Sequence, residues 1–134
     1  KERRLSLRKH PLDDVAARTD SPPQDVKMAY ARLRASRVLF LEADGQTIRM
    51  APPFSGVRTQ HQALIDGVSY YANCAWDALG IPAALHRPAT VLSRCEQSRE
   101  PLHLEVGLNG PGPSPWLFHC VVPAAHWWDD LVFT

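Results

Sequence analysis

A cysteine and an aspartate lie three residues apart in the stretch YYANCAWDALGIP, residues 70–82. Residues at that spacing share one face of a helix, so the thiol of Cys74 and the carboxyl group of Asp77 are expected to converge on one small site. A carboxyl group at an apolar border tends to have a raised pKa, which suits a proton carrier near neutral pH. For the thiol, a helix N-terminus favours the thiolate whereas burial and the acid oppose it, so the direction of its pKa stays open.

The same pair has a purely structural interpretation. Free cysteine is among the most buried residue types, and an aspartate one helical turn away is common. On the expected helix, Tyr71, Cys74, Ala75 and Ala78 form an apolar stripe with Asp77 at its edge. Spacing alone therefore favours a buried thiol beside a surface carboxylate, and further context has to decide between the two.

The other two cysteines are expected to be structural. Cys95 lies near the end of a predicted strand, and Cys120 alternates with Phe118 and Val122 in a run expected to face a core. Three widely spaced cysteines without a Cys-x-x-Cys motif predict neither a disulfide framework nor a tetrahedral zinc site. We therefore expect reduced thiols in a reducing compartment.

The remaining polar and aromatic candidates have ordinary structural explanations. Lone histidines beside strands or turns usually make hydrogen bonds, tryptophan pairs usually pack, and aspartates after an aromatic run often cap a turn. The residues concerned are His119, His126, Trp127, Trp128, Asp129 and Asp130. Tyr70 and Tyr71 flank the cysteine–aspartate pair and are candidates to position its carboxyl group.

The composition is that of a globular cytoplasmic protein. The chain has 134 residues, of which 45% are hydrophobic and 22% charged, and its net charge is +1. This balance suits one ordinary domain or two small modules and excludes wholesale disorder. No apolar run approaches the roughly 20 residues of a membrane helix, and the N-terminus has no signal-peptide pattern. We expect a cytoplasmic location, no membrane partner and no nucleic-acid partner on grounds of charge.

The pattern of residues 11–50 predicts two helices followed by a hairpin. PLDDVAARTD is a short amphipathic helix, and Ser21 and Pro22 suit the start of a second helix that runs to about residue 34. The second helix should bury a stripe of Val26, Ala29, Tyr30 and Leu33 and expose Lys27, Arg32 and Arg34. The dipeptide Asp44–Gly45 then predicts a hairpin turn. This order indicates a winged-helix-like module over residues 1–52.

A second module is expected over residues 53–134. Residues 51–60, APPFSGVRTQ, have the composition of a connector, and residues 66–82 are expected to form a helix. The runs ATVLSRC, LHLEVGL and WLFHCVV predict three strands, with the turn-rich loop NGPGPSP before the last. The fold class is therefore α+β, with a mixed or antiparallel sheet in the second module.

The chain resembles the organomercurial lyase (alkylmercury lyase) family. The matching stretches are YYANCAWDALGIPAALHRPATVLSRC, EPLHLEV and HCVVPAAHWWDDLVFT, with Cys74, Asp77 and Cys95 at the family's spacing. The preceding IRMAPPFSGV and the helix–helix–hairpin order also look like the family's N-terminal half. The resemblance spans nearly the whole chain and is specific in the second module.

The resemblance implies protonolysis of a carbon–mercury bond to a hydrocarbon and Hg(II). Mercury is soft and thiophilic, so thiolates are its natural ligands and push electron density onto the metal-bound carbon. By this resemblance Cys74 is a mercury ligand and Asp77 is the proton shuttle, with no cofactor. The organomercurial is the substrate, and the product Hg(II) is a candidate for hand-off to a mercuric reductase.

One feature of the family pattern is missing from the 134 residues. The family uses a second catalytic cysteine, which by spacing falls just beyond Thr134, so we expect a chain truncated before it or a protein that lacks the second thiol. Cys120 is a poor replacement because its strand position is expected to face a core. Two alternatives therefore stay open: a thiol-based sensor of mercury or copper whose winged helix contacts DNA, and an enzyme of the same fold with another substrate.

The sensor alternative is tested by duplex binding. Lys27, Arg32 and Arg34 would have to neutralise phosphates, so any such binding should weaken steeply with salt. We expect no specific shift of duplex DNA in a mobility assay. A salt-sensitive, sequence-dependent shift would contradict this and favour the sensor.

Overall fold

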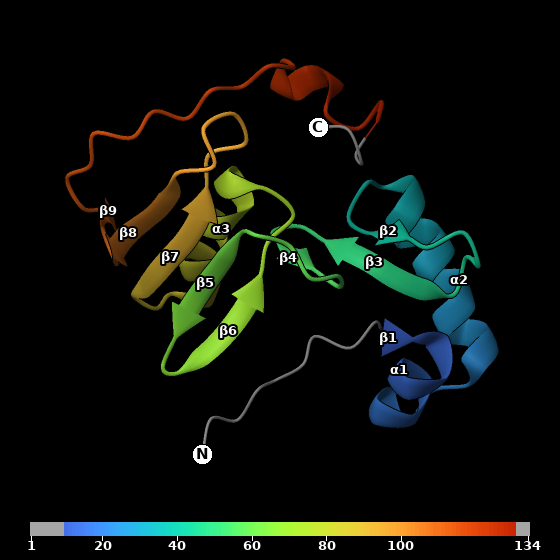
Figure 1. Cartoon of the computed structure of the whole chain (residues 1–134). Helices are drawn as coiled ribbons and strands as arrows, with labels where there is room; N and C mark the ends of the chain where they lie inside the picture. The colour runs from blue at the N-terminus through green and yellow to red at the C-terminus, as the bar shows by residue number, and fades with distance from the viewer. Residues whose placement is uncertain (1–9, 131–134) are drawn as a thin grey trace.

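The computed structural model describes residues 10–130, which fold into two antiparallel sheets and three α-helices (Figure 1). The first sheet and two helices come from the N-terminal part, and the second sheet and the third helix from the rest. The α+β class predicted from the sequence is confirmed. Within the described range, none of the helices is long and apolar enough to cross a membrane.

The N-terminal unit has the predicted order of two helices and a hairpin. Its elements are β1 (His10–Pro11), α1 (Leu12–Thr19), α2 (Pro23–Ala35), β2 (Phe40–Leu41), β3 (Thr47–Ala51) and β4 (Phe54–Ser55). The strand β3 is central, because β1, β2 and β4 all pair with it. A small core joins helices and sheet, made of Leu12, Ala16, Val26, Tyr30, Leu39 and Leu41.

The second helix differs from its prediction at its start and on its buried face. Its N-cap is Pro22, without a side-chain hydrogen bond, rather than Ser21. Val26 and Tyr30 are buried as predicted, but Leu33 is 38% exposed because the small core closes around the first half of the helix. The basic residues Lys27, Arg32 and Arg34 are exposed as expected.

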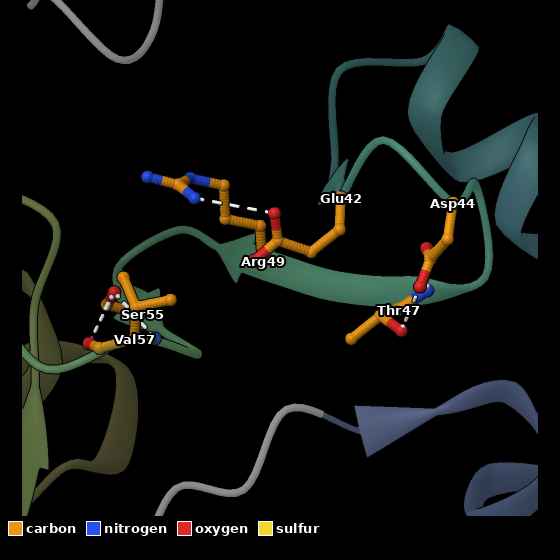
Figure 2. Close-up of polar contacts among 6 residues, drawn as sticks. All are labelled: Glu42, Asp44, Thr47, Arg49, Ser55 and Val57. Carbon is orange, nitrogen blue, oxygen red and sulfur yellow. Dashed lines mark hydrogen bonds and ion pairs between the residues drawn. The ribbon is translucent and has the colours of Figure 1, made fainter.

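The hairpin turn is fixed by the carboxylate of Asp44. It accepts hydrogen bonds from the backbone N–H groups of Gln46 (2.8 Å) and Thr47 (2.9 Å). It also accepts a hydrogen bond from the Thr47 hydroxyl at 2.6 Å (Figure 2). Gly45 follows with a positive φ of 66°, a backbone conformation that glycine adopts without steric cost. The predicted Asp44–Gly45 hairpin is thus confirmed, and this turn chemistry sets the register of β2 against β3.

The expected connector, residues 51–60, contains a strand. β4 pairs with β3, and Phe54 also forms a bridge with Ala72 of the second unit. Ser55 is buried, donates its hydroxyl to the Val57 carbonyl at 2.9 Å and accepts the Val57 N–H at 3.2 Å (Figure 2). A boundary between residues 52 and 53 would fall between the paired strands β3 and β4, and the division into two domains stays a prediction.

The second unit is a five-stranded antiparallel sheet with one helix packed on it. Its elements are β5 (Gln62–Ile65), β6 (Val68–Tyr71), α3 (Ala75–Leu85), β7 (Ala89–Arg94), β8 (Pro101–Gly107) and β9 (Gly110–Pro111), in the order β6-β5-β7-β8-β9. Of the two sheet types expected here, the antiparallel one is found. The main core lies between α3 and the sheet and includes Ala63, Ile65, Ala78, Ile81, Val91 and Val106.

The helix expected over residues 66–82 is wrong in its first half. Val68–Tyr71 is the strand β6, paired with β5 through a two-residue turn at Asp66 and Gly67. Both turn residues have positive φ (50° and 77°), as this tight hairpin requires. The apolar and aromatic run VSYY therefore belongs to a strand, and only the part from Ala75 onward is helical.

The helix α3 also continues past its predicted end. Gly80 and Pro82 were expected to terminate it, yet it runs to Leu85 with Pro82 inside and buried. A β-carbon at Gly80 would lie 3.1 Å from the Cβ atom of Pro53, so the glycine permits close contact with the β3–β4 turn. Glycine and proline both disfavour a helix interior. The contact of Gly80 with Pro53 and the burial of Pro82 nevertheless keep this stretch helical.

The third strand predicted at residues 116–122 is not formed. This stretch is irregular, Phe118 is 47% exposed and Cys120 is exposed, so the predicted core-facing alternation is wrong. The segment after β9 is rich in proline, which cannot donate to a strand ladder. It runs past the sheet to a short 3₁₀ helix, η1 (Ala124–His126), drawn in orange and red in Figure 1.

The core between α3 and the sheet should dominate stability. Ile81 is fully buried, so Ile81→Ala is expected to lower the free energy of unfolding by about 2–5 kcal/mol in urea titrations. The control Leu117→Ala truncates a side chain that is 93% exposed and should change it by less than about 0.5 kcal/mol. Equal effects of the two substitutions would contradict this placement of the core.

Candidate active site

The chain enters the candidate site directly from the end of β6. The N–H of Ala72 donates to the His61 carbonyl (2.9 Å), and the Ala72 carbonyl accepts the Thr59 hydroxyl (2.6 Å). Ala72 is fully buried and bridges Phe54 of β4. Ala72 is therefore held from two sides, and this anchors the start of the turn into α3.

Cys74 is the N-cap of α3. Its backbone is extended (φ −146°, ψ 179°), its carbonyl accepts the Ala78 N–H at 3.1 Å, and its sulfur accepts the Asp77 N–H at 3.5 Å. An N-cap side chain normally places an oxygen on this unpaired donor, and here the sulfur takes that position. Asp77 is the third helical residue, where a capping box places its acid.

The cysteine and the aspartate do converge, although the reason differs from the prediction. They do not share a stripe along a helix, because Tyr71 lies in a strand and Cys74 lies before the first turn. Instead, the Cys74 sulfur accepts the backbone N–H of Asp77 at 3.5 Å across the helix N-terminus, and the Asp77 carboxylate lies near enough to raise the pKa of the thiol. Both side chains are half-buried.

Burial governs the protonation of both groups. It raises the pKa of the Cys74 thiol; the backbone N–H of Asp77 opposes this, and the Asp77 carboxylate adds to it. Burial likewise raises the pKa of the Asp77 carboxyl group, against hydrogen bonds first from Asn73 and then from Cys74. The sequence left open whether the pKa of the thiol is raised or lowered. In the structure it is raised, because burial outweighs the backbone hydrogen bond at the helix N-terminus.

Asn73 is a site residue that the sequence analysis did not identify. Its side-chain Nδ2 lies 3.0 Å from Asp77 Oδ2 and 3.5 Å from the Phe54 carbonyl oxygen. The available signal was an amide side chain immediately before a cysteine N-cap and four residues before an acid. The incorrect helix prediction placed Asn73 inside a helix. The position of Cys74 as a helix cap, and of Asn73 just before it, was therefore not recognised.

The aromatic residues around the site have specific partners. Trp76, in the first turn of α3, is 52% exposed and contacts Phe118 with ring centroids 5.4 Å apart. Tyr70 packs against Phe54 at 6.1 Å, and the Tyr71 hydroxyl accepts a hydrogen bond from Arg58 Nε at 2.9 Å. Tyr70 and Tyr71 therefore contact Phe54 and Arg58 rather than the Asp77 carboxyl group, which they were candidates to position.

The other cysteines lie in loops. Cys95 follows β7, and its sulfur accepts the Ser98 N–H at 3.5 Å; hydrogen bonds led by the one from the Ser98 side chain lower the pKa of its thiol. The Cys120 thiol is exposed and donates to the Val122 carbonyl at 2.7 Å. Within the part of the chain that the structure describes, no group of three or more histidine, cysteine or acidic residues could hold a metal ion.

The C-terminal candidates make local contacts. His126 Nδ1 hydrogen-bonds to Asp129 Oδ2 at 2.9 Å, next to η1. The Trp127 Nε1–H donates to the Val122 carbonyl at 2.7 Å. The His126–Asp129 contact fits the expectation of hydrogen-bonded and turn-capping roles, whereas Trp127, for which packing was expected, makes a hydrogen bond.

The influence of Asp77 on Cys74 predicts a change in thiol reactivity. Asp77→Asn removes the negative charge and the hydrogen bond that raise the pKa of the Cys74 thiol, while the backbone N–H that lowers it stays. The pH midpoint for iodoacetamide alkylation of Cys74 should therefore fall, and alkylation at pH 7 should become faster. Peptide-resolved mass spectrometry follows each cysteine separately, with Cys120 as the internal control whose rate stays the same. Slower alkylation of Cys74 in the variant would contradict the stated direction.

Comparison with known proteins identifies the family. The family model for alkylmercury lyase (MerB) matches residues 54–134. Alkylmercury lyases of Bacillus cereus, Staphylococcus epidermidis and Streptomyces lividans are 30%, 31% and 32% identical to this chain over 95, 96 and 95 residues. These regions cover 71–72% of this chain but only 41–42% of the relatives, so the chain spans less than half of their length.

A solved structure gives the same answer for the fold. The mercury-bound form of MerB2 superposes with a TM-score of 0.59 at 24% identity, covering 78% of this chain and 50% of that one. At this identity the likeness concerns the fold alone. The family match, in contrast, covers more than half of the chain, including α3 with its cysteine cap and the antiparallel sheet beneath it. This chain therefore belongs to the alkylmercury lyase family.

Proposed function

We propose that this chain binds an organomercurial through Cys74 and takes part in cleaving its carbon–mercury bond, with Asp77 as the proton carrier. The observation that carries the proposal is the Cys74 cap of α3, whose sulfur accepts the Asp77 N–H at 3.5 Å and so lies beside the residue that bears the carboxyl group. Family membership supports it, because the matched region contains both residues.

The first step is exchange of a proton for mercury at sulfur. The Cys74 thiol is protonated at neutral pH, because burial raises its pKa. When the sulfur bonds to the R–Hg⁺ group, the thiol proton must leave, and the neighbouring Asp77 carboxylate accepts it. The raised pKa of the carboxyl group, caused by burial, lets it keep the proton near the metal-bound carbon.

The second step returns the proton to carbon. The carbon–mercury bond breaks with its electron pair on carbon, the carbon takes the proton from Asp77, and the hydrocarbon R–H leaves. Hg(II) stays on sulfur, and Asp77 is again a carboxylate. A second soft ligand would increase the electron density on carbon before this step, which is the role the family resemblance gives to a further cysteine.

Three further proposals concern the two domains, the fate of the Hg(II) product and the surface that binds the organic group. The N-terminal unit is a winged-helix-like module (residues 1–52) that does not bind DNA, followed by the lyase-like domain (residues 53–134). The Hg(II) product passes to a mercuric reductase, which requires a cytoplasmic location. Trp76 and Phe118, exposed and in contact, offer an apolar surface near α3 for the organic group.

Two substitutions separate capture from cleavage. Cys74→Ser exchanges a soft ligand for a hard one and should abolish retention of phenylmercury after desalting, measured as bound mercury per chain. Asp77→Asn keeps the shape but has no proton to transfer, so retention should survive while hydrocarbon release falls by about 10²-fold or more. These 134 residues do not include the second catalytic cysteine that the family resemblance implies, so slow or no turnover is expected of them, and cleavage is measured with a second thiol supplied.

The control is Cys120→Ser, which removes an exposed thiol and should leave phenylmercury retention at Cys74 intact. Release of benzene at a rate unaffected by Asp77→Asn would show that another group delivers the proton. Retention unaffected by Cys74→Ser would show that the mercury ligand lies elsewhere, and the proposal would fail.

A further inference from the structure

We propose that the side chains of Trp76 and Phe118, called the aromatic pair below, bind an aryl group beside Cys74 and make this chain prefer arylmercury over alkylmercury compounds. The inference deepens the proposed function and rests on it, because it requires that the Cys74 sulfur captures the metal. It adds the chemical class of the organic group and names the two side chains that recognise it.

The place of Trp76 on α3 directs its ring toward the capture site. Trp76 is the second residue of α3, two positions after the Cys74 cap. In an α-helix each Cα–Cβ bond tilts toward the N-terminus, and a long side chain covers the turn before its own residue. Because α3 begins at Ala75, no turn of this helix precedes Trp76. Its side chain therefore extends over the helix end that carries the Cys74 sulfur.

The two rings of the aromatic pair cover each other only in part. Phe118 belongs to the irregular segment after β9, and its ring centroid lies 5.4 Å from that of Trp76 with the planes inclined by 48°. Trp76 is still 52% exposed and Phe118 is 47% exposed. A tilted contact of this kind leaves part of each ring open to a third ring. Large apolar rings open to solvent beside a thiol are typical of a binding surface rather than a core.

Two other aromatic side chains of this region are already in contact with neighbours. The Tyr70 ring packs against Phe54, and the Arg58 guanidinium lies over the Tyr71 ring at 5.7 Å from its centroid. These contacts occupy both tyrosines. The aromatic pair is therefore the apolar surface that the first turn of α3 offers to a bound organic group.

The chemistry of capture brings the organic group to this surface. Two-coordinate Hg(II) is linear, so it holds its organic group on the side opposite the thiolate sulfur. After capture by Cys74 that group projects away from the sulfur beside the first turn of α3. An aryl ring presents a face and an edge to the aromatic pair, whereas a methyl group presents neither. Aromatic contacts of this kind change an affinity by about 2- to 10-fold beyond the effect of buried area.

The wild-type chain offers a direct test by NMR. Phenylmercury bound to Cys74 should shift the indole N–H signal of Trp76 and the ring signals of Phe118, because the phenyl ring current acts on nearby protons. Methylmercury bound to the same sulfur should shift them much less. Trp76→Phe removes one of the four indole signals and thereby assigns it. Equal shifts with both compounds would overturn the proposal.

Substitutions test whether the rings recognise aromatic character or only apolar bulk. Competition with free cysteine measures how tightly the chain holds phenylmercury and cyclohexylmercury, whose organic groups are similar in size. Trp76→Leu keeps an apolar side chain but should lower the preference for phenylmercury by about 2- to 10-fold, and Trp76→Phe should keep most of it. Phe118→Leu, in an irregular segment, should act in the same direction and decides the question if Trp76→Leu does not fold.

The matched control is Leu117→Ala, which truncates the 93% exposed neighbour of Phe118 and should leave the preference unchanged. An unchanged preference in folded Trp76→Leu and Phe118→Leu chains would refute the aryl surface, while Cys74-dependent retention of phenylmercury would still support the proposed function. Phenylmercury retention that survives Cys74→Ser would instead refute the proposed function, and this inference with it. The two failures are therefore distinguishable.

Discussion

The site depends on the unpaired N–H groups at the start of α3. A helix N-terminus leaves backbone donors without partners, and here the sulfur of Cys74 accepts one of them at 3.5 Å. This cap places the thiol outside the helix and next to the third residue, Asp77, whose carboxylate raises the pKa of the thiol. One interaction therefore begins the helix and also creates a thiol–carboxyl pair, so the folding of α3 and the chemistry of the site cannot be separated.

Opposing electrostatic effects set the protonation of this pair. Burial favours the neutral form of both groups, whereas the backbone N–H favours the thiolate and the Asn73 amide favours the carboxylate. In both groups burial is the larger effect. A protonated thiol beside a carboxylate is suited to a thiophilic substrate, because the metal itself displaces the thiol proton and the adjacent carboxylate is placed to receive it.

The strand β4 connects the two halves of the fold at this site. It pairs with β3 of the first sheet, bridges Ala72 at the entrance to α3 and supplies the carbonyl that holds Asn73. The N-terminal unit consequently contributes to the site through the backbone of β4. Gly80 permits the β3–β4 turn to approach α3, so a small residue inside the helix serves this contact.

The sequence by itself determined the α+β class, the Asp44–Gly45 turn and the strands β7 and β8, and it singled out Cys74 and Asp77 as a candidate pair. These depend on local chemistry: the Asp44 carboxylate binds its own turn, and the runs ATVLSR and PLHLEVG form the paired strands β7 and β8. Tertiary structure decided the rest. VSYY became a strand because it pairs with β5, and Pro82 stayed helical because the core buries it. The role of Asn73 was invisible in the sequence, because its partner Phe54 lies 19 positions away and meets it only through the pairing of β4 with the start of α3.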